Sequence, residues 1–213
     1  MLRRYSVSLD LSQKACLVVG GGPVAERKVH SLLECGARVL VVSPEITPGL
    51  ESLSGEDRID CRRRQYRTSD LEGVFLVVGS TDQETINQQV AEDGFTRNLL
   101  VNIVDDPSKG NFFVPAVVKR GALTISVSTD GKSPMLAKKI REELETVYGP
   151  QYQEYLEMVG SLREEVIRNV QDPGEKRKIL ESFADDRVLG LLKEGRMGEV
   201  KERLLSAHCG SRS

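Results

Sequence analysis

The stretch CLVVGGGPVAERKV, residues 16–29, places three consecutive glycines between a short apolar run and a helix-like segment. Adjacent glycines cost conformational entropy that packing alone does not require, so this turn needs a further reason. Gly20, Gly22 and Ala25 fit the spacing G-x-G-x-x-A, which permits a tight turn, a close approach of the backbone to a pyrophosphate, and close packing of helix on strand. The free N–H groups of the helix N-terminus then favour phosphate. The stretch predicts a strand–turn–helix unit that binds a dinucleotide.

Four apolar runs without strict polar alternation recur through the first half of the chain. Such strands are buried on both faces, as in a parallel sheet covered by helices. Helix-like segments at 24–34 and 83–92 lie between them. We therefore expect an α/β fold with a Rossmann-type doubly wound parallel sheet. The runs are ACLVV (15–19), ARVLVV (37–42), VFLVVGS (74–80) and LLVNIV (99–104).

The pattern divides the chain into three parts. Residues 1–111 hold the predicted nucleotide-binding sheet. Residues 112–149 contain two strand-like runs and an amphipathic helix, which Asp130 or Ser133 would cap. Residues 150–213 carry only helix signals and predict a C-terminal helical domain.

Polar residues follow the second and third apolar runs, where the carboxyl ends of parallel strands form a ligand crevice. Ser43 ends the second run, and Glu45 follows Pro44, slightly beyond the usual place of the acidic residue that binds a ribose 2′-OH. No arginine follows there to pair with a 2′-phosphate, which favours NAD over NADP. Ser80 and Thr81 follow the third run. We predict that the glycine turn binds the cofactor together with five residues: Ser43, Pro44, Glu45, Ser80 and Thr81.

The amino-acid composition argues against two kinds of binding partner, nucleic acids and membranes. The formal net charge is −2, aromatic residues make up 5%, and tryptophan is absent, which argues against nucleic-acid binding. The N-terminus has no apolar leader region, and no apolar run approaches the length of a membrane span. We expect a cytoplasmic protein without a membrane anchor.

Metal-ligating residues are sparse. The four cysteines form no C-x-x-C pair, and Cys16 and Cys35 lie in apolar segments, where small buried thiols are expected. His30 is expected on the surface or in packing, and His208 lies in the tail. The sequence therefore predicts no metal site.

Two adjacent carboxylates, Asp105 and Asp106, end the fourth apolar run within VNIVDDPSKGNFFVPA, residues 101–116. Because this run is a predicted strand of the sheet, both should face the same crevice as the glycine turn. One of them could act as a general base or bind a cation. The alternative is an ordinary turn, since Asp before Pro is common in turns.

Three motifs in this order carry a family resemblance: VVGGGPVAERK, VNIVDDPSKGNFFVPA and SVSTDGKSPMLAKKIREELE. They resemble the precorrin-2 dehydrogenase/sirohydrochlorin ferrochelatase family, which includes the N-terminal part of siroheme synthase. The resemblance implies a homodimer with a middle dimerisation region and a C-terminal helical domain. It implies that NAD accepts a hydride from precorrin-2 to give sirohydrochlorin. Some members then insert ferrous iron, and the sequence leaves open whether this chain does.

The resemblance also implies residue roles. Asp105 matches the catalytic aspartate, and the pairs Pro23–Val24 and Pro44–Glu45 match NAD contacts. Thr129 stands where siroheme synthase can carry a phosphorylated serine.

The substrate carries many carboxylates, so its pocket should be basic. Ser128, Thr129, Lys132 and Arg120 are the predicted substrate-binding residues. We expect about half of six clustered cations to touch it: Lys119, Arg120, Lys132, Lys138, Lys139 and Arg141. The competing interpretation is an NAD-sensing regulatory module without catalysis, which would not need Asp105 at the crevice.

Overall fold

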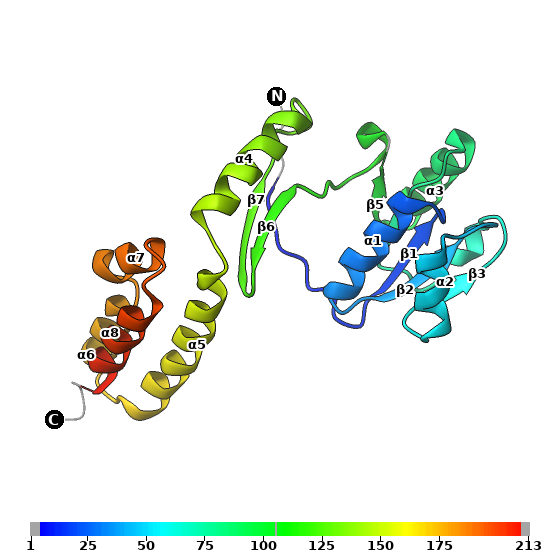
Figure 1. Ribbon diagram of the computed structural model, residues 1–213. Helices are drawn as coiled ribbons and strands as arrows, with labels where there is room; N and C mark the ends of the chain where they lie inside the picture. The colour runs from blue at the N-terminus through cyan, green and yellow to red at the C-terminus, as the bar shows by residue number, and fades with distance from the viewer. Residues whose placement is uncertain (1–4, 105, 210–213) are drawn as a thin grey trace. The chain divides into compact units, whose positions relative to one another are not determined.

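The computed structural model describes residues 5–104 and 106–209, and the chain forms two compact units that divide between Val114 and Pro115 (Figure 1). The first unit holds a five-stranded parallel sheet in the order β3-β2-β1-β4-β5. This confirms the predicted α/β fold with a Rossmann-type sheet. The strands are β1 (Ala15–Val19), β2 (Arg38–Val42), β3 (Asp60–Arg62), β4 (Leu76–Gly79) and β5 (Leu100–Ile103).

Helices bury both faces of this sheet, which explains why its strands are continuously apolar. Cys16 and Val18 of β1 pack in one core with α1 (Pro23–Glu34) and α2 (Pro48–Gly55). Leu17 and Val19, on the opposite face, pack in a second core with α3 (Glu84–Thr96). Cys16 is buried as expected, but Cys35 is exposed, because it follows the last residue of α1 at the surface.

Asp70 joins the end of β3 to the short helix η1 (Thr68–Leu71). Its fully buried carboxylate accepts hydrogen bonds from Arg64 at 2.5 and 2.8 Å, from Arg62 at 2.7 Å, and from the backbone N–H of Arg67 at 3.0 Å. The Arg64 guanidinium, with Arg67 and Arg62, lowers the pKa of Asp70 to about 2. The buried charge is therefore fully satisfied.

We predict that Asp70 makes this unit sensitive to acid. A carboxyl whose folded pKa lies below its unfolded pKa of about 3.9 stabilises the fold above that value, and the contribution is lost as pH falls toward 2. The lowered pKa corresponds to about 2 kcal/mol. Urea denaturation between pH 5 and pH 2 should show wild type losing about that much more stability than Asp70→Asn. Parallel losses in both proteins would contradict the prediction.

The second unit begins with the antiparallel pair β6 (Ala116–Arg120) and β7 (Leu123–Val127), followed by α4 (Pro134–Val147). Ser133, not Asp130, caps α4: its hydroxyl accepts a hydrogen bond from the N–H of Leu136 at 3.2 Å. Asp130 stands in the turn before it with a φ of 52°.

Four further helices, α5 (Gln151–Asn169), α6 (Pro173–Ser182), α7 (Asp186–Lys193) and α8 (Met197–Cys209), share one core. Phe183 and Leu192 are completely buried in it. This agrees with the helix signals of the C-terminal sequence. The finer division of the second unit at residue 150 stays a prediction. Over the described ranges, no helix has the length and apolar character needed to cross a bilayer.

Candidate functional site

A cleft with a volume of about 740 Å³ lies where β1, β2 and β4 end. This size is typical of a small-molecule or cofactor site. Its wall is formed by the ends of β1 and β2, by the loops that follow the three strands, by the first turns of α1 and α3, and by Gln65 and Tyr66. The structure brings all nine predicted cofactor-binding residues into this wall: Gly20, Gly22, Pro23, Val24, Ser43, Pro44, Glu45, Ser80 and Thr81.

The three glycines of the turn have different surroundings. Gly20 has a φ of 125°, and a Cβ there would lie 2.6 Å from the backbone oxygen of Ser80. A Cβ on Gly21 would lie 2.0 Å from the backbone oxygen of Glu45. A Cβ on Gly22 would meet nothing within 4 Å. The first two glycines therefore let neighbouring loops approach, whereas the third leaves open space in the cleft wall.

The first turn of α1 offers free hydrogen-bond donors. Pro23 occupies the first helical position, where no N–H is needed, and the N–H of Glu26 donates to the carbonyl of Gly22 at 3.0 Å. The N–H groups of Val24 and Ala25 precede the first intrahelical bond and lie at the positive end of the helix dipole. This arrangement suits a pyrophosphate.

Thr47 braces the loop after β2 against the glycine turn. Its N–H donates to the carbonyl of Gly21 at 2.9 Å, and its hydroxyl donates to the carboxylate of Glu26. The same hydroxyl oxygen caps α2 by accepting from the N–H of Leu50 at 3.3 Å. The sequence analysis missed this residue, although Thr before Pro is a recognisable helix start.

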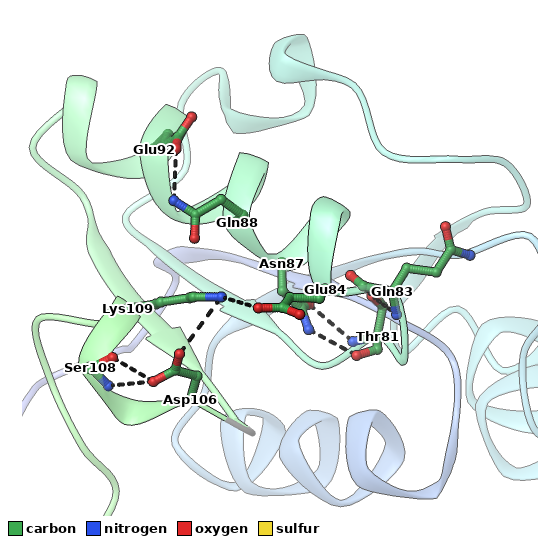
Figure 2. A network of polar contacts seen from close by, with 9 residues as sticks. All are labelled: Thr81, Gln83, Glu84, Asn87, Gln88, Glu92, Asp106, Ser108 and Lys109. Carbon is green, nitrogen blue, oxygen red and sulfur yellow. Dashed lines mark hydrogen bonds and ion pairs between the residues drawn. The ribbon is translucent and has the colours of Figure 1, made fainter.

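Asn87, on the first turns of α3, shapes the loop after β4. Its buried side-chain amide donates to the carbonyl of Thr81 at 2.8 Å and accepts from the N–H of Thr81 at 3.3 Å (Figure 2). Ser80 is held on the other side, because its N–H donates to the carbonyl of Val19 at 2.8 Å. Hydrogen bonds to α3 and β1 therefore hold the cleft wall at Thr81 and Ser80.

The charged residues among the described lining are both acidic, Glu45 and Asp82. Tyr66 also lines the cleft and donates its hydroxyl to Asp93 at 3.0 Å, and burial, with this contact, raises the pKa of Tyr66. Tyr66 thus stays neutral at physiological pH. A lining without a cation suits the 2′-OH of NAD better than the 2′-phosphate of NADP.

The two aspartates that follow β5 are Asp105 and Asp106. Asp105 lies outside the described residues. Asp106 is not part of the cleft lining, so the expectation that it faces the crevice is wrong. Its carboxylate caps the short helix η2 (Pro107–Lys109) by accepting from the N–H and the hydroxyl of Ser108 at 3.0 and 2.5 Å. These bonds to Ser108 lower the pKa of Asp106.

The predicted substrate-binding residues belong to the second unit and form two groups. Ser128, Thr129 and Lys132 lie in the turn before α4, where the hydroxyl of Thr129 accepts from the N–H of Ser133 at 3.1 Å. Arg120 lies at the opposite end of the β-hairpin and donates to the carbonyl of Glu145 in the last turn of α4 at 3.3 Å. The two ends of this helix are about 20 Å apart, so Arg120 is not beside the other three.

The basic residues of α4 are largely occupied by their own helix. Arg141 contacts Glu145 at 2.6 Å and Glu142 at 3.1 Å, and Lys138 lies 3.9 Å from Glu142. Two of the six clustered cations, Lys138 and Arg141, take part in these pairs, and the expectation that about half of the six contact the substrate stays a prediction. Throughout the described ranges, no group of three or more His, Cys, Asp or Glu side chains is placed to hold a metal ion.

Family models match most of the chain. A model described as "Putative NAD(P)-binding" matches residues 7–116, and one described as "Sirohaem biosynthesis protein central" matches residues 120–146. The first ends close to the boundary between the two compact units.

Curated relatives and a solved structure agree with these matches. The chain is 34% identical to Siroheme synthase 1 of Serratia proteamaculans over 92% of its length, and 36% identical to the siroheme synthase of Thioalkalivibrio sulfidiphilus over 95%. It spans only 41% and 42% of those two proteins.

Among solved structures, "SirC, precorrin-2 dehydrogenase" is similar with a TM-score of 0.79 and 29% identity. That match covers 93% of this chain and 100% of the other. The glycine-turn cleft, the two family models and these relatives lead to one conclusion: the chain belongs to the NAD(P)-binding family found in the N-terminal part of siroheme synthases.

Proposed function

We propose that the protein oxidises precorrin-2 to sirohydrochlorin with NAD, in the biosynthesis of siroheme. The observation that carries the proposal is the cleft at the glycine turn, in a chain that matches the full length of a precorrin-2 dehydrogenase. The acidic lining of the cleft supports NAD as the cofactor. The nine lining residues predicted from sequence would hold it. A cytoplasmic location is part of the proposal.

The reaction removes two electrons and two hydrogens from the macrocycle, one as a hydride and one as a proton. Bound NAD supplies the hydride acceptor. Asp105 is the proposed acceptor of the proton, since an ionised carboxylate needs no prior deprotonation to act as a base. Asp106 is the weaker candidate for this role, because its carboxylate already caps η2 by accepting from Ser108.

The turn before α4 is the proposed substrate-binding element. Ser128 and Thr129 offer hydroxyls, and Lys132 is an exposed cation beside them. Together they can bind carboxylate side chains of a tetrapyrrole. Arg120 would contact the substrate only from the far end of α4, so we expect its contribution to be smaller.

A homodimer is also proposed, from the packing of residues 115–147. Their buried apolar side chains are Val118 and Ala137, too few for an independent core. Met135, Leu136 and Val147 of α4 are meanwhile exposed. A second copy of the chain could cover these side chains. Sedimentation should give twice the mass of 23.6 kDa at micromolar concentration, and a monomer would contradict the proposal.

The test of the reaction is anaerobic absorption spectroscopy of the purified protein with precorrin-2 and NAD. Formation of sirohydrochlorin that requires both protein and NAD is the expected result. Ferrous iron added afterwards shows whether siroheme forms faster than without protein. If NAD binds but the tetrapyrrole spectrum never changes, the dehydrogenase proposal fails and a regulatory NAD sensor takes its place.

A further inference from the structure

The turn that follows β5 leaves the sheet and returns to the same strand. On its outgoing side, the N–H of Val104 donates to the carbonyl of Gly79 at 3.0 Å. On its returning side, the N–H of Asn111 donates to the carbonyl of Val101 at 2.9 Å, and the side-chain oxygen of Asn111 accepts from the N–H of Val101 at 2.8 Å. The base of the turn is therefore closed by backbone and side-chain bonds.

Lys109 ties the described part of this turn to a different element. Its ammonium contacts Glu84, in the first turn of α3, at 2.9 Å, and Asp106 at 3.6 Å (Figure 2). The Lys109 side chain is only 22% exposed. The contact with Glu84, together with Asp106, raises the pKa of Lys109, so the cation persists across physiological pH.

The element that Lys109 contacts also shapes the cleft. Glu84 lies one helical turn before Asn87, whose amide fixes both backbone groups of Thr81. Thr81 lines the cleft. Figure 2 shows this series, from Asp106 and Lys109 through Glu84 and Asn87 to Thr81. One end of α3 thus holds both the cofactor loop and the acidic turn.

We propose that Lys109 is a positioning residue, which fixes the acidic turn relative to the cofactor loop through Glu84. This rests on the proposed function, in which Asp105 of that turn takes the proton. The alternative is that Lys109 forms a surface ion pair that contributes little to stability or turnover. Two features favour positioning: Lys109 is mostly covered, and it contacts carboxylates of two elements, the first turn of α3 and the turn that follows β5.

Lys109→Met should test the role in turnover, because it removes the charge and keeps much of the side-chain volume. We expect kcat to fall by about 10- to 100-fold, since small misplacement of reacting groups costs rates of that order. The dissociation constant of NAD should stay within about twofold, because the cleft wall itself is intact. Lys109→Arg should recover most of kcat, since it restores a cation between the same carboxylates.

Lys201→Met is the matched control. Lys201 also joins two helices, contacting Glu154 at 3.1 Å, but it lies in the second unit and is 55% exposed. Its kcat should equal that of wild type. A Lys109→Met enzyme with unchanged kcat, or an equal loss in both variants, would overturn the positioning role.

Hydrogen exchange gives a readout that needs no turnover. Amides of the peptide 104–112 should exchange faster in Lys109→Met than in wild type, and should be unchanged in Lys201→Met. Unchanged exchange in Lys109→Met would overturn the proposal even if kcat falls. If wild type itself does not oxidise precorrin-2, the proposed function fails, and exchange still decides whether Lys109 holds the turn.

Discussion

Gly22→Asp is expected to abolish NAD binding while the fold survives. A Cβ at this position meets nothing within 4 Å, so the protein can accept the side chain. The new carboxylate would stand at the N-cap of α1, where the pyrophosphate of the cofactor is proposed to bind. Like charges at such a contact cost several kcal/mol, which corresponds to at least about a 100-fold rise in the dissociation constant. Calorimetric titration with NAD measures it, and circular dichroism verifies the fold.

Two alanine variants distinguish the role of the glycines in cofactor binding from their role in the packing of the turn. Gly22→Ala adds only a methyl group in open space, so its thermal unfolding should match that of wild type. Gly21→Ala would place a Cβ 2.0 Å from the backbone oxygen of Glu45, and such overpacking costs about 1–3 kcal/mol of stability. Normal NAD affinity in Gly22→Asp would mean that the nucleotide binds elsewhere.

The sheet could be predicted because its central strands are continuous apolar runs that can be recognised from local sequence alone. Runs such as ACLVV are apolar on both faces, and helices cover both faces in the structure. β3 was missed, because Asp60–Arg62 is short and polar, and it forms only by pairing with β2 at the sheet edge. The strand β3 brings Arg62 and Arg64 close to the buried Asp70. No local sequence pattern predicts this contact.

The site could be predicted where a sequence motif reflects a constraint on the backbone, as the glycine spacing does at Gly20 and Gly22. Asn87 was missed because its partner Thr81 lies in the loop before its own helix, where no motif marks the contact. Thr47 was missed because its partners, Gly21 and Glu26, are distant in sequence. Asp106 illustrates the opposite error. Its carboxylate caps the short helix that follows it, in agreement with the alternative of an ordinary turn. Arg120 was grouped with the substrate-binding turn by sequence proximity, and the hairpin places it at the opposite end.

Asp105→Asn is expected to abolish oxidation of precorrin-2 and leave NAD affinity nearly unchanged. The amide keeps the shape of the carboxylate but cannot take the proton, and loss of a general base typically reduces the rate by about 10²- to 10⁴-fold. Single-turnover absorption with saturating NAD measures this loss directly. NAD titration should agree with wild type within about twofold, because no predicted cofactor contact has changed.

Asp106→Asn is the neighbouring control for this prediction. Asparagine can still cap η2 by accepting from the N–H of Ser108, and the contact between Lys109 and Glu84 remains. We therefore expect less than about a tenfold loss of rate, far smaller than in Asp105→Asn. If the two variants lose activity equally, the acidic turn acts as a structural unit and the proton acceptor lies elsewhere. If Asp105→Asn turns over at the wild-type rate, hydride transfer proceeds without this base, and the role of Asp105 implied by the family resemblance does not hold for this chain.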